Sequence, residues 1–78
     1  MKYFLITYDR SVGKILSLKE FDESGRSLAL KERFALEREL RDRVTVEVVV
    51  LGSASMEELK RTHSRYFMDA PFPVEHAG

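Results

Sequence analysis

The stretch from residue 44 to residue 51, VTVEVVVL, constrains the fold of this chain more than any other segment. Valine favours extended backbone, because its branched side chain packs well on a pleated sheet. Successive side chains of a strand point to opposite faces, so one face carries the valines at 44, 46, 48 and 50. The other face carries Val49 and Leu51 beside Thr45 and Glu47. The sequence therefore predicts a strand that is apolar on both faces.

An antiparallel hairpin is predicted at the N-terminus. Residues 3–8, YFLITY, are aromatic or β-branched, and six residues are too few for a helix of ordinary length. Residues 9–13 supply the turn, in which Gly13 is free to take a positive φ angle. Residues 15–19, ILSLK, then form the second strand of the hairpin.

Two amphipathic helices are predicted between and after these strands. The first covers about residues 27–42, with Ser24 or Ser27 as its N-cap and dense charge on its outer face. The second opens at Ser55, which forms an S-x-x-E capping box with Glu58. The inner side of the second helix carries Met56, Leu59, His63, Tyr66 and Phe67.

These elements predict an α+β fold, a two-layer ββαβα sandwich. The hairpin makes the first two strands antiparallel, and the helical crossover makes the third strand parallel to the second. We expect a three-stranded mixed sheet of order 2-1-3, with both helices on one face. The side chains expected to face the helices are Phe4, Ile6, Leu16, Leu18 and the four even-numbered valines. Residues 1–68 would form this single domain, and residues 69–78, with two prolines and no periodicity, a flexible tail.

Length and composition narrow the function classes. The 78 residues carry 13 Lys and Arg against 13 Asp and Glu, so the net charge is zero and a strongly electrostatic binder of nucleic acid or membrane is disfavoured. The absence of cysteine excludes disulfides and thiolate metal sites and favours the cytoplasm. No apolar run approaches the roughly 20 residues that span a bilayer.

The predicted sheet leaves an apolar open face and a long apolar edge at its third strand. Natural proteins usually cover or blunt such an edge, and an uncovered one invites pairing with another chain. We therefore expect an interaction module that forms a homodimer or binds another protein through this edge or face. The expected interface residues are Tyr3, Leu5, Glu47, Val49 and Leu51, with Glu47 setting the register. In the alternative, the tail folds back and covers the face with Phe72 and Val74.

A second hypothesis is an RNA-binding or ribosome-associated module. The first helix carries several arginines, of which Arg33, Arg38 and Arg41 are the candidate contacts. Acidic residues are interleaved among them, however, and this pattern is typical of a solvated helix surface.

A third hypothesis, an enzyme that uses His63, has the least support. His63 has neither a second histidine nor a carboxylate at ligand spacing, because His76 lies in the tail. No nucleophilic triad, paired carboxylates or zinc-binding motif is present. The sequence therefore predicts no catalytic residue, no metal and no cofactor.

Two segments, KYFLITYDRSVGKIL and VVVLGSASMEELKRTHSRYF, give the chain a resemblance to known sequences. The chain resembles short uncharacterised actinobacterial proteins over residues 2–67. The resemblance implies one compact unit that ends at Phe67, and it implies no activity.

Overall fold

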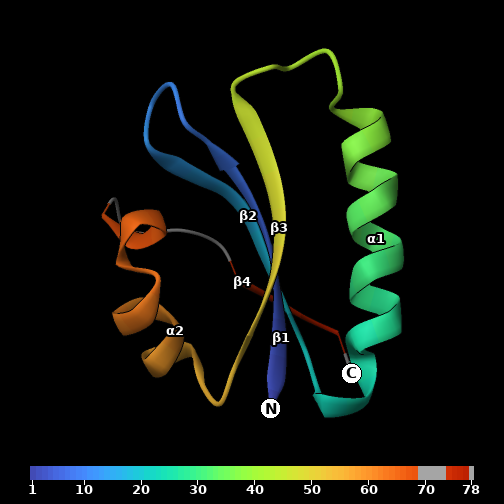
Figure 1. The fold of residues 1–78 in the computed structure, drawn as a ribbon, viewed down its shortest axis with the longest axis vertical. Helices are drawn as coiled ribbons and strands as arrows, with labels where there is room; N and C mark the ends of the chain where they lie inside the picture. Colours follow the sequence, from blue (N-terminus) through green and yellow to red (C-terminus); the bar gives the residue numbers. More distant parts are fainter. Residues whose placement is uncertain (69–73, 78) are drawn as a thin grey trace.

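The structure, a computed structural model, describes residues 1–68 and the backbone of residues 74–77 (Figure 1). The sheet contains β1 (Lys2–Asp9), β2 (Lys14–Phe21), β3 (Val46–Ser53) and β4 (Val74–Ala77). The helices are α1 (Arg26–Glu39) and α2 (Met56–Thr62). The strands lie in the order β3-β1-β2-β4, which confirms the α+β class and the predicted order 2-1-3 of the first three strands. These three strands pair antiparallel throughout, so the predicted mixed pairing among them is wrong.

The hairpin of β1 and β2 forms as predicted. Tyr3 pairs with Phe21 at its open end, and a bulge interrupts the register between Thr7 and Tyr8. Gly13 takes the left-handed conformation in the turn, with φ of 66°. The Asp9 carboxylate accepts hydrogen bonds from the hydroxyl and the amide of Ser11, at 2.7 and 2.9 Å. These two bonds hold the pKa of Asp9 below its ordinary value.

The register between β1 and β3 decides which side chains share a face of the sheet. The two strands are antiparallel, and Ile6 lies opposite Val49 while Leu5 lies opposite Val50. Directly opposed residues point to the same face. Val49 therefore lies on the face of Ile6, whereas Val50 lies on the face of Leu5. The predicted pairing of Ile6 with the even-numbered valines is wrong by one residue.

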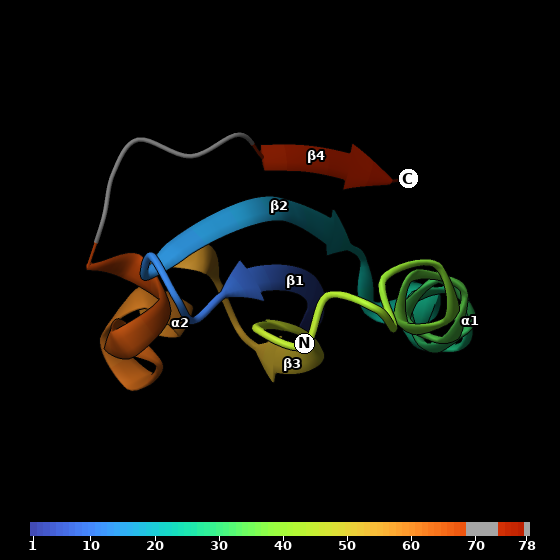
Figure 2. The same cartoon turned by 90° about the horizontal axis from the view of Figure 1, so that it is seen from above.

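The two helices cover opposite faces of the sheet (Figure 2). Under α2, Leu59 packs in a cluster of buried side chains with Phe4 and Ile6 from β1. Under α1, Ala29 packs in a second cluster with Leu5 and Val48. The predicted two-layer arrangement, with both helices on one face, is therefore wrong. A strand that is apolar on both faces instead takes one helix on each side.

The predicted N-cap of α2 is confirmed, whereas the predicted N-cap of α1 is wrong. Ser55 caps α2 as predicted, since its hydroxyl accepts a hydrogen bond from the amide of Glu58 at 3.1 Å. Neither predicted serine caps α1, which follows directly from a 3-10 turn at residues 23–25. That turn is capped by Asp22, whose carboxylate accepts from the Ser24 amide. A Cβ at Gly25 would stand 2.8 Å from the Cβ of Phe21, so this close approach requires glycine.

Three segments depart from the predicted boundaries. β3 begins two residues later than expected, and Val44 is 79% exposed in the preceding loop. Leu16, expected in the core, lies exposed at the bulge of β2. Residues 74–77, expected in a flexible tail, form β4, which pairs in parallel with β2. Residues 69–73 and 78 lie outside the described residues, as do the expected contacts of Phe72 and of the Val74 side chain.

Candidate functional site

The outer edge of β3 is the candidate functional site. β3 is the terminal strand of the sheet, and within the described residues no strand pairs with its outer side. The amide of Arg10 donates to the carbonyl of Thr45 at 2.9 Å, at the start of the β1–β3 ladder. Backbone groups of an antiparallel strand alternate in direction from residue to residue. The odd-numbered residues of β3 therefore bond to β1, and the even-numbered ones point outward.

Three amides remain directed away from the sheet on this edge. The amide of Val46 turns back and donates to the carbonyl of Arg43 at 3.0 Å. The outward amides that follow it along β3 belong to Val48, Val50 and Gly52. Together with the neighbouring carbonyls, these groups form a ladder that an added strand can complete.

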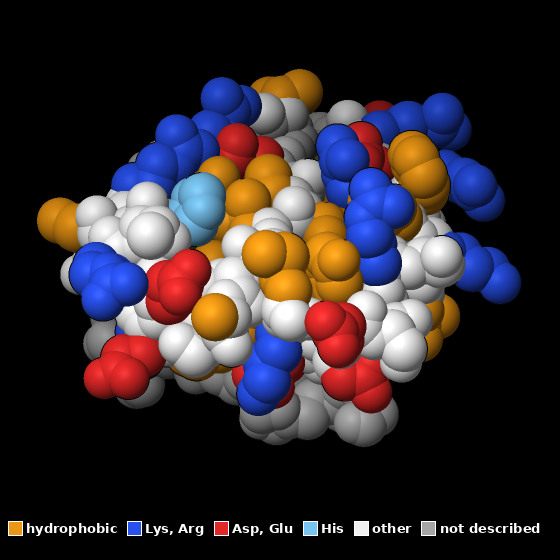
Figure 3. Space-filling view, turned by 60° about the horizontal axis from the view of Figure 1, so that its bottom comes forward, with side chains coloured by type: hydrophobic (Ala, Val, Ile, Leu, Met, Phe, Trp, Pro, Cys, Tyr) orange, Lys and Arg blue, Asp and Glu red, His pale blue; other side chains and the backbone are white. Residues whose placement is uncertain are grey.

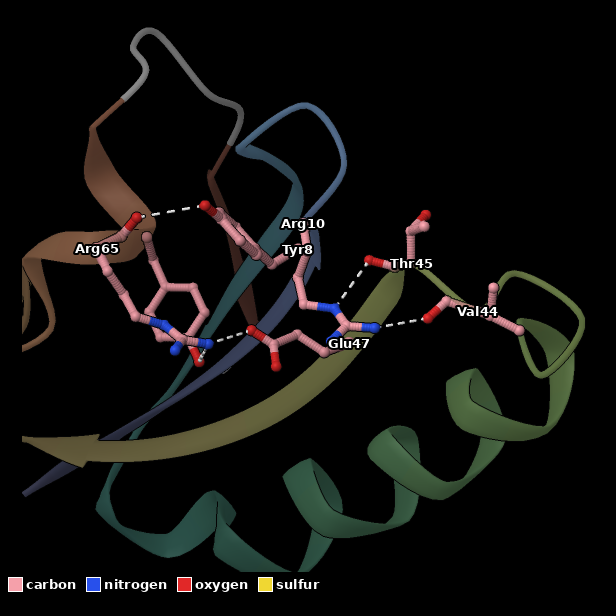
Figure 4. Close-up of polar contacts among 7 residues, drawn as sticks. Tyr8, Arg10, Val44, Thr45, Glu47 and Arg65 are labelled. Carbon is pink, nitrogen blue, oxygen red and sulfur yellow. Dashed lines mark hydrogen bonds and ion pairs between the residues drawn. The ribbon is translucent and has the colours of Figure 1, made fainter.

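Glu47 is the only charged residue of β3, and Arg65 engages it (Figure 4). The Arg65 guanidinium donates a hydrogen bond to the Glu47 carboxylate, which raises the pKa of Arg65. The same guanidinium donates to the hydroxyl of Tyr66 at 3.1 Å and lies 4.7 Å from the centre of its ring. The charge of Glu47 is thus partly neutralised from the α2 side, which weakens its protection of the edge.

Two tyrosines anchor Arg65 against the sheet. The rings of Tyr8 and Tyr66 meet edge to face, with centroids 4.9 Å apart. The Tyr8 hydroxyl donates to the carbonyl of Arg65 at 3.4 Å. Burial raises the pKa of Tyr66, and the negative charge of Glu47 raises it further.

Arg10 fixes the loop that leads into β3. Its guanidinium donates to the carbonyl of Val44 at 2.7 Å and to that of Thr45 at 3.5 Å (Figure 4). These bonds occupy the carbonyls just before the strand, so the edge open to a partner begins at Val46.

The expected interface residues are divided between the two faces. Leu5 is buried beneath α1, and Tyr3 is half-buried in the same cluster, with its ring against Gly52. Val49 and Leu51 are half-buried beside the α2 cluster. The expected open face is therefore covered by the helices, and the edge of β3 is the part of the predicted surface that is left uncovered.

An exposed aromatic residue lies on α1, and the sequence interpretation did not include it in the interface. Phe34 is 61% exposed. In Figure 3, hydrophobic side chains gather in the middle of the visible face, with Lys and Arg side chains on both sides of them. Phe34 comes two residues before Leu36, which packs beneath α1, so the two side chains lie on nearly opposite sides of the helix.

The candidate RNA contacts do not form a surface of one sign. Arg33 is paired with Glu37, one turn further along α1, at 2.7 Å. Arg38 and Arg41 are exposed near the end of the helix, where acidic Glu39 and Asp42 alternate with them.

His63 lies just after α2, and its amide donates to the carbonyl of Leu59 at 2.9 Å. The half-buried side chain lines a hollow of about 450 Å³ together with Leu51 and Arg65. Among the described residues, no group of three His, Cys, Asp or Glu side chains is arranged to hold a metal ion.

A cavity of about 290 Å³ lies between α1 and β2 on the other face. Lys19 and Glu32 form an ion pair across it, with the Lys19 Nζ 3.0 and 3.3 Å from the two carboxylate oxygens. The pair satisfies both charges and ties the helix to the sheet. We therefore assign this pair to the packing of α1.

Comparison with family models, with curated proteins and with solved structures finds no match to this chain. In the described part of the chain, none of the helices has the length and apolar character needed to cross a membrane.

Proposed function

We propose that this protein is a non-enzymatic interaction module that accepts a strand along the outer edge of β3. The observation that carries the proposal is the row of outward amides at Val48, Val50 and Gly52 on an eight-residue strand. Within the described residues nothing pairs with this row. A module of this kind contributes binding rather than chemistry, and the absence of cysteine suits a reducing compartment such as the cytoplasm.

The edge of β3 lacks the features that normally prevent strand addition. Proline, lysine and bulges are the usual protections, and β3 contains none of them. Its one charged side chain, Glu47, is engaged by Arg65. The opposite side of the sheet differs, because β4 pairs with β2 there. The sheet thus ends in a short strand of four residues at β4 and in a long strand of eight residues at β3, and the long edge offers more backbone groups to a partner.

An added strand would gain affinity from the main chain and specificity from the side chains. Each outward amide of β3 would donate to a carbonyl of the incoming strand, as in other cases of β-strand addition. Side chains of the incoming strand would alternate between the α2 side, beside Val49, and the α1 side, beside Val50. Both sides present apolar neighbours, so a strand rich in Val, Ile or Thr would fit best.

Amide hydrogen exchange measured by NMR tests the proposal. The probe is a synthetic nonapeptide of alternating Thr and Val with a lysine at each end. At saturating peptide, we expect exchange of the Val48, Val50 and Gly52 amides to slow at least tenfold. The amides of Val49 and Leu51 already bond to β1 and serve as internal controls. Fast exchange at all three outward amides, both with and without the peptide, would contradict the proposal.

A matched pair of variants isolates the backbone contribution. Both Val50→Pro and Val50→Ala replace the valine side chain. Only Val50→Pro also removes the outward amide, because proline has no backbone N–H. We expect only Val50→Pro to abolish peptide binding, while circular dichroism shows that both variants remain folded. Equal losses in the two variants would mean that the side chain, and not the edge, makes the contact.

A further inference from the structure

We infer that the strand accepted by β3 is the β3 of a second copy of this chain, paired antiparallel about a two-fold axis at Val49. The two Phe34 side chains then meet beside that axis on the α1 side. This inference rests on the proposed function, because it names the occupant of the same edge.

The backbone of β3 complements itself about Val49. Directly opposed residues in an antiparallel pair lie on the same face, so the two residue numbers must share parity. With the axis at Val49, the Val48 amide meets the carbonyl of Val50 in the second copy, and the Val50 amide meets that of Val48. The Gly52 amide meets the carbonyl of Val46. All three outward amides of each copy are thereby satisfied.

The positions at Glu47 and Val48 fit less well. An axis at Val50 would also pair all three outward amides, and the level of Phe34 along the sheet selects Val49. An axis at Glu47 would place the two carboxylates directly opposite each other, which is destabilising. An axis at Val48 would set the Gly52 amide against the carbonyl of Val44, which already accepts a hydrogen bond from Arg10. With the axis at Val49, Glu47 of each copy lies opposite Leu51 of the other, and the two carboxylates stay apart.

Phe34 lies at the same level as Val49 along the sheet. Leu40 of the turn after α1 lines a hollow together with Val46, the first residue of β3. Phe34 precedes Leu40 by six residues, or about 9 Å along a helix. A strand covers the same length in about three residues, so the residue of β3 level with Phe34 is Val49, three residues after Val46.

Phe34 also points toward the β3 side of α1. Glu37 lines the hollow beside β3, whereas Glu32 and Ala35 line the cavity on the β2 side. Residues of a helix are about 100° apart, so Phe34 lies about 60° from Glu37 around the axis. Its exposed ring therefore lies on the side of α1 that is nearer to β3 than to β2, and it is turned outward from the sheet.

A second copy suits this surface better than a partner of strong charge. The chain has no net charge, so two copies do not repel each other. The apolar centre of the surface would meet an identical apolar centre, as a two-fold interface requires. A two-fold interface uses the same β3 edge of both copies, so the assembly closes as a dimer.

Single-cysteine variants test the position of the axis, since the natural chain contains no cysteine. At the axis, the two Val49 residues form a pair without hydrogen bonds, with Cα atoms about 4.5 Å apart. That spacing permits a disulfide. Val49→Cys should cross-link nearly completely under mild oxidation at micromolar concentration. The control, Val12→Cys, places an exposed cysteine at the hairpin tip and should stay largely uncross-linked.

A second pair of variants covers the case in which Val49→Cys fails to fold. Phe34→Ser and Leu28→Ser both replace exposed apolar residues of α1, and Leu28 lies on the opposite side of the helix from β3. In sedimentation equilibrium, we expect Phe34→Ser to weaken association at least tenfold and Leu28→Ser to leave it within twofold. Equal effects of the two variants would overturn the inference.

The outcomes separate this inference from the proposed function. A chain that is monomeric at high micromolar concentration, but whose Val48, Val50 and Gly52 amides are still protected by the nonapeptide, overturns only the second copy as occupant. A dimer in which Val49→Cys cross-links no faster than Val12→Cys overturns the β3 axis. Loss of both self-association and peptide protection overturns the proposed function as well.

Discussion

Replacing Leu59 by alanine should cost the fold a large part of its stability. Leu59 is fully buried, with 0% exposure, in the cluster beneath α2. Truncation of a buried leucine to alanine typically costs about 2–5 kcal/mol, because it removes apolar contacts and leaves a cavity. α2 has only seven residues, too few to form a stable helix alone, so it depends on this contact. We expect about 3 kcal/mol for Leu59→Ala.

That loss is large for a chain of 78 residues, whose total stability is of the order of 4–12 kcal/mol. For a domain of this size, 3 kcal/mol lowers the Tm by about 12–24 °C. Urea titration followed by circular dichroism gives the free energy, and a thermal scan gives the Tm. The control is Leu28→Ala, at a residue that is 49% exposed, which should cost less than about 1 kcal/mol. A loss below about 1 kcal/mol for Leu59→Ala would refute the role of α2 as the cover of its own face.

Three further predictions follow from single contacts. Gly25→Ala should destabilise the fold by about 1–3 kcal/mol in urea titration, because the new Cβ would clash with Phe21. The control, Gly52→Ala, meets only the flexible side chain of Met1 and should change stability by less than about 1 kcal/mol. In ultraviolet titration of the phenols, the difference between the natural protein and Tyr66→Phe should give a pKa above the ordinary value of 10.0, and a value at or below it would contradict burial of that ring. Folding lowers the pKa of Asp9, so its contribution to stability is present above the ordinary value of 3.8 and is lost as the pH falls through the folded value. Asp9→Asn should therefore reduce the dependence of the unfolding free energy on pH in the acid range. An unchanged dependence would argue against the hydrogen bonds of the turn.

The types of the elements could be predicted from the sequence, but the pairing between strands could not. Period-two valines identified β3, and the capping box at Ser55 identified α2. The register between β1 and β3 depends on side chains of two distant segments, and both segments are apolar on both faces. A strand of that kind gives no signal for which face lies inward, so a shift by one residue could not be detected. The prediction also placed both helices on one face, whereas the structure places them on opposite faces.

The candidate site could be predicted in part. The sequence pointed to the apolar edge of the third strand and to Glu47 within it. The outward amides at Val48, Val50 and Gly52 follow only from the observed register with β1, because a shift by one residue would exchange them for their neighbours. β4 was missed because its four residues, close to two prolines, are too few to show a period.

One layer of backbone separates α1 from α2, and the two helices rest on opposite sides of the same strands (Figure 2). Phe4 and Leu5 are neighbours in the chain, yet each belongs to the interior beneath a different helix. A side-chain rearrangement under one helix therefore displaces the support of the other. The motions of α1 and α2 should be correlated, so that backbone relaxation measured in one helix reports on a substitution made beneath the other.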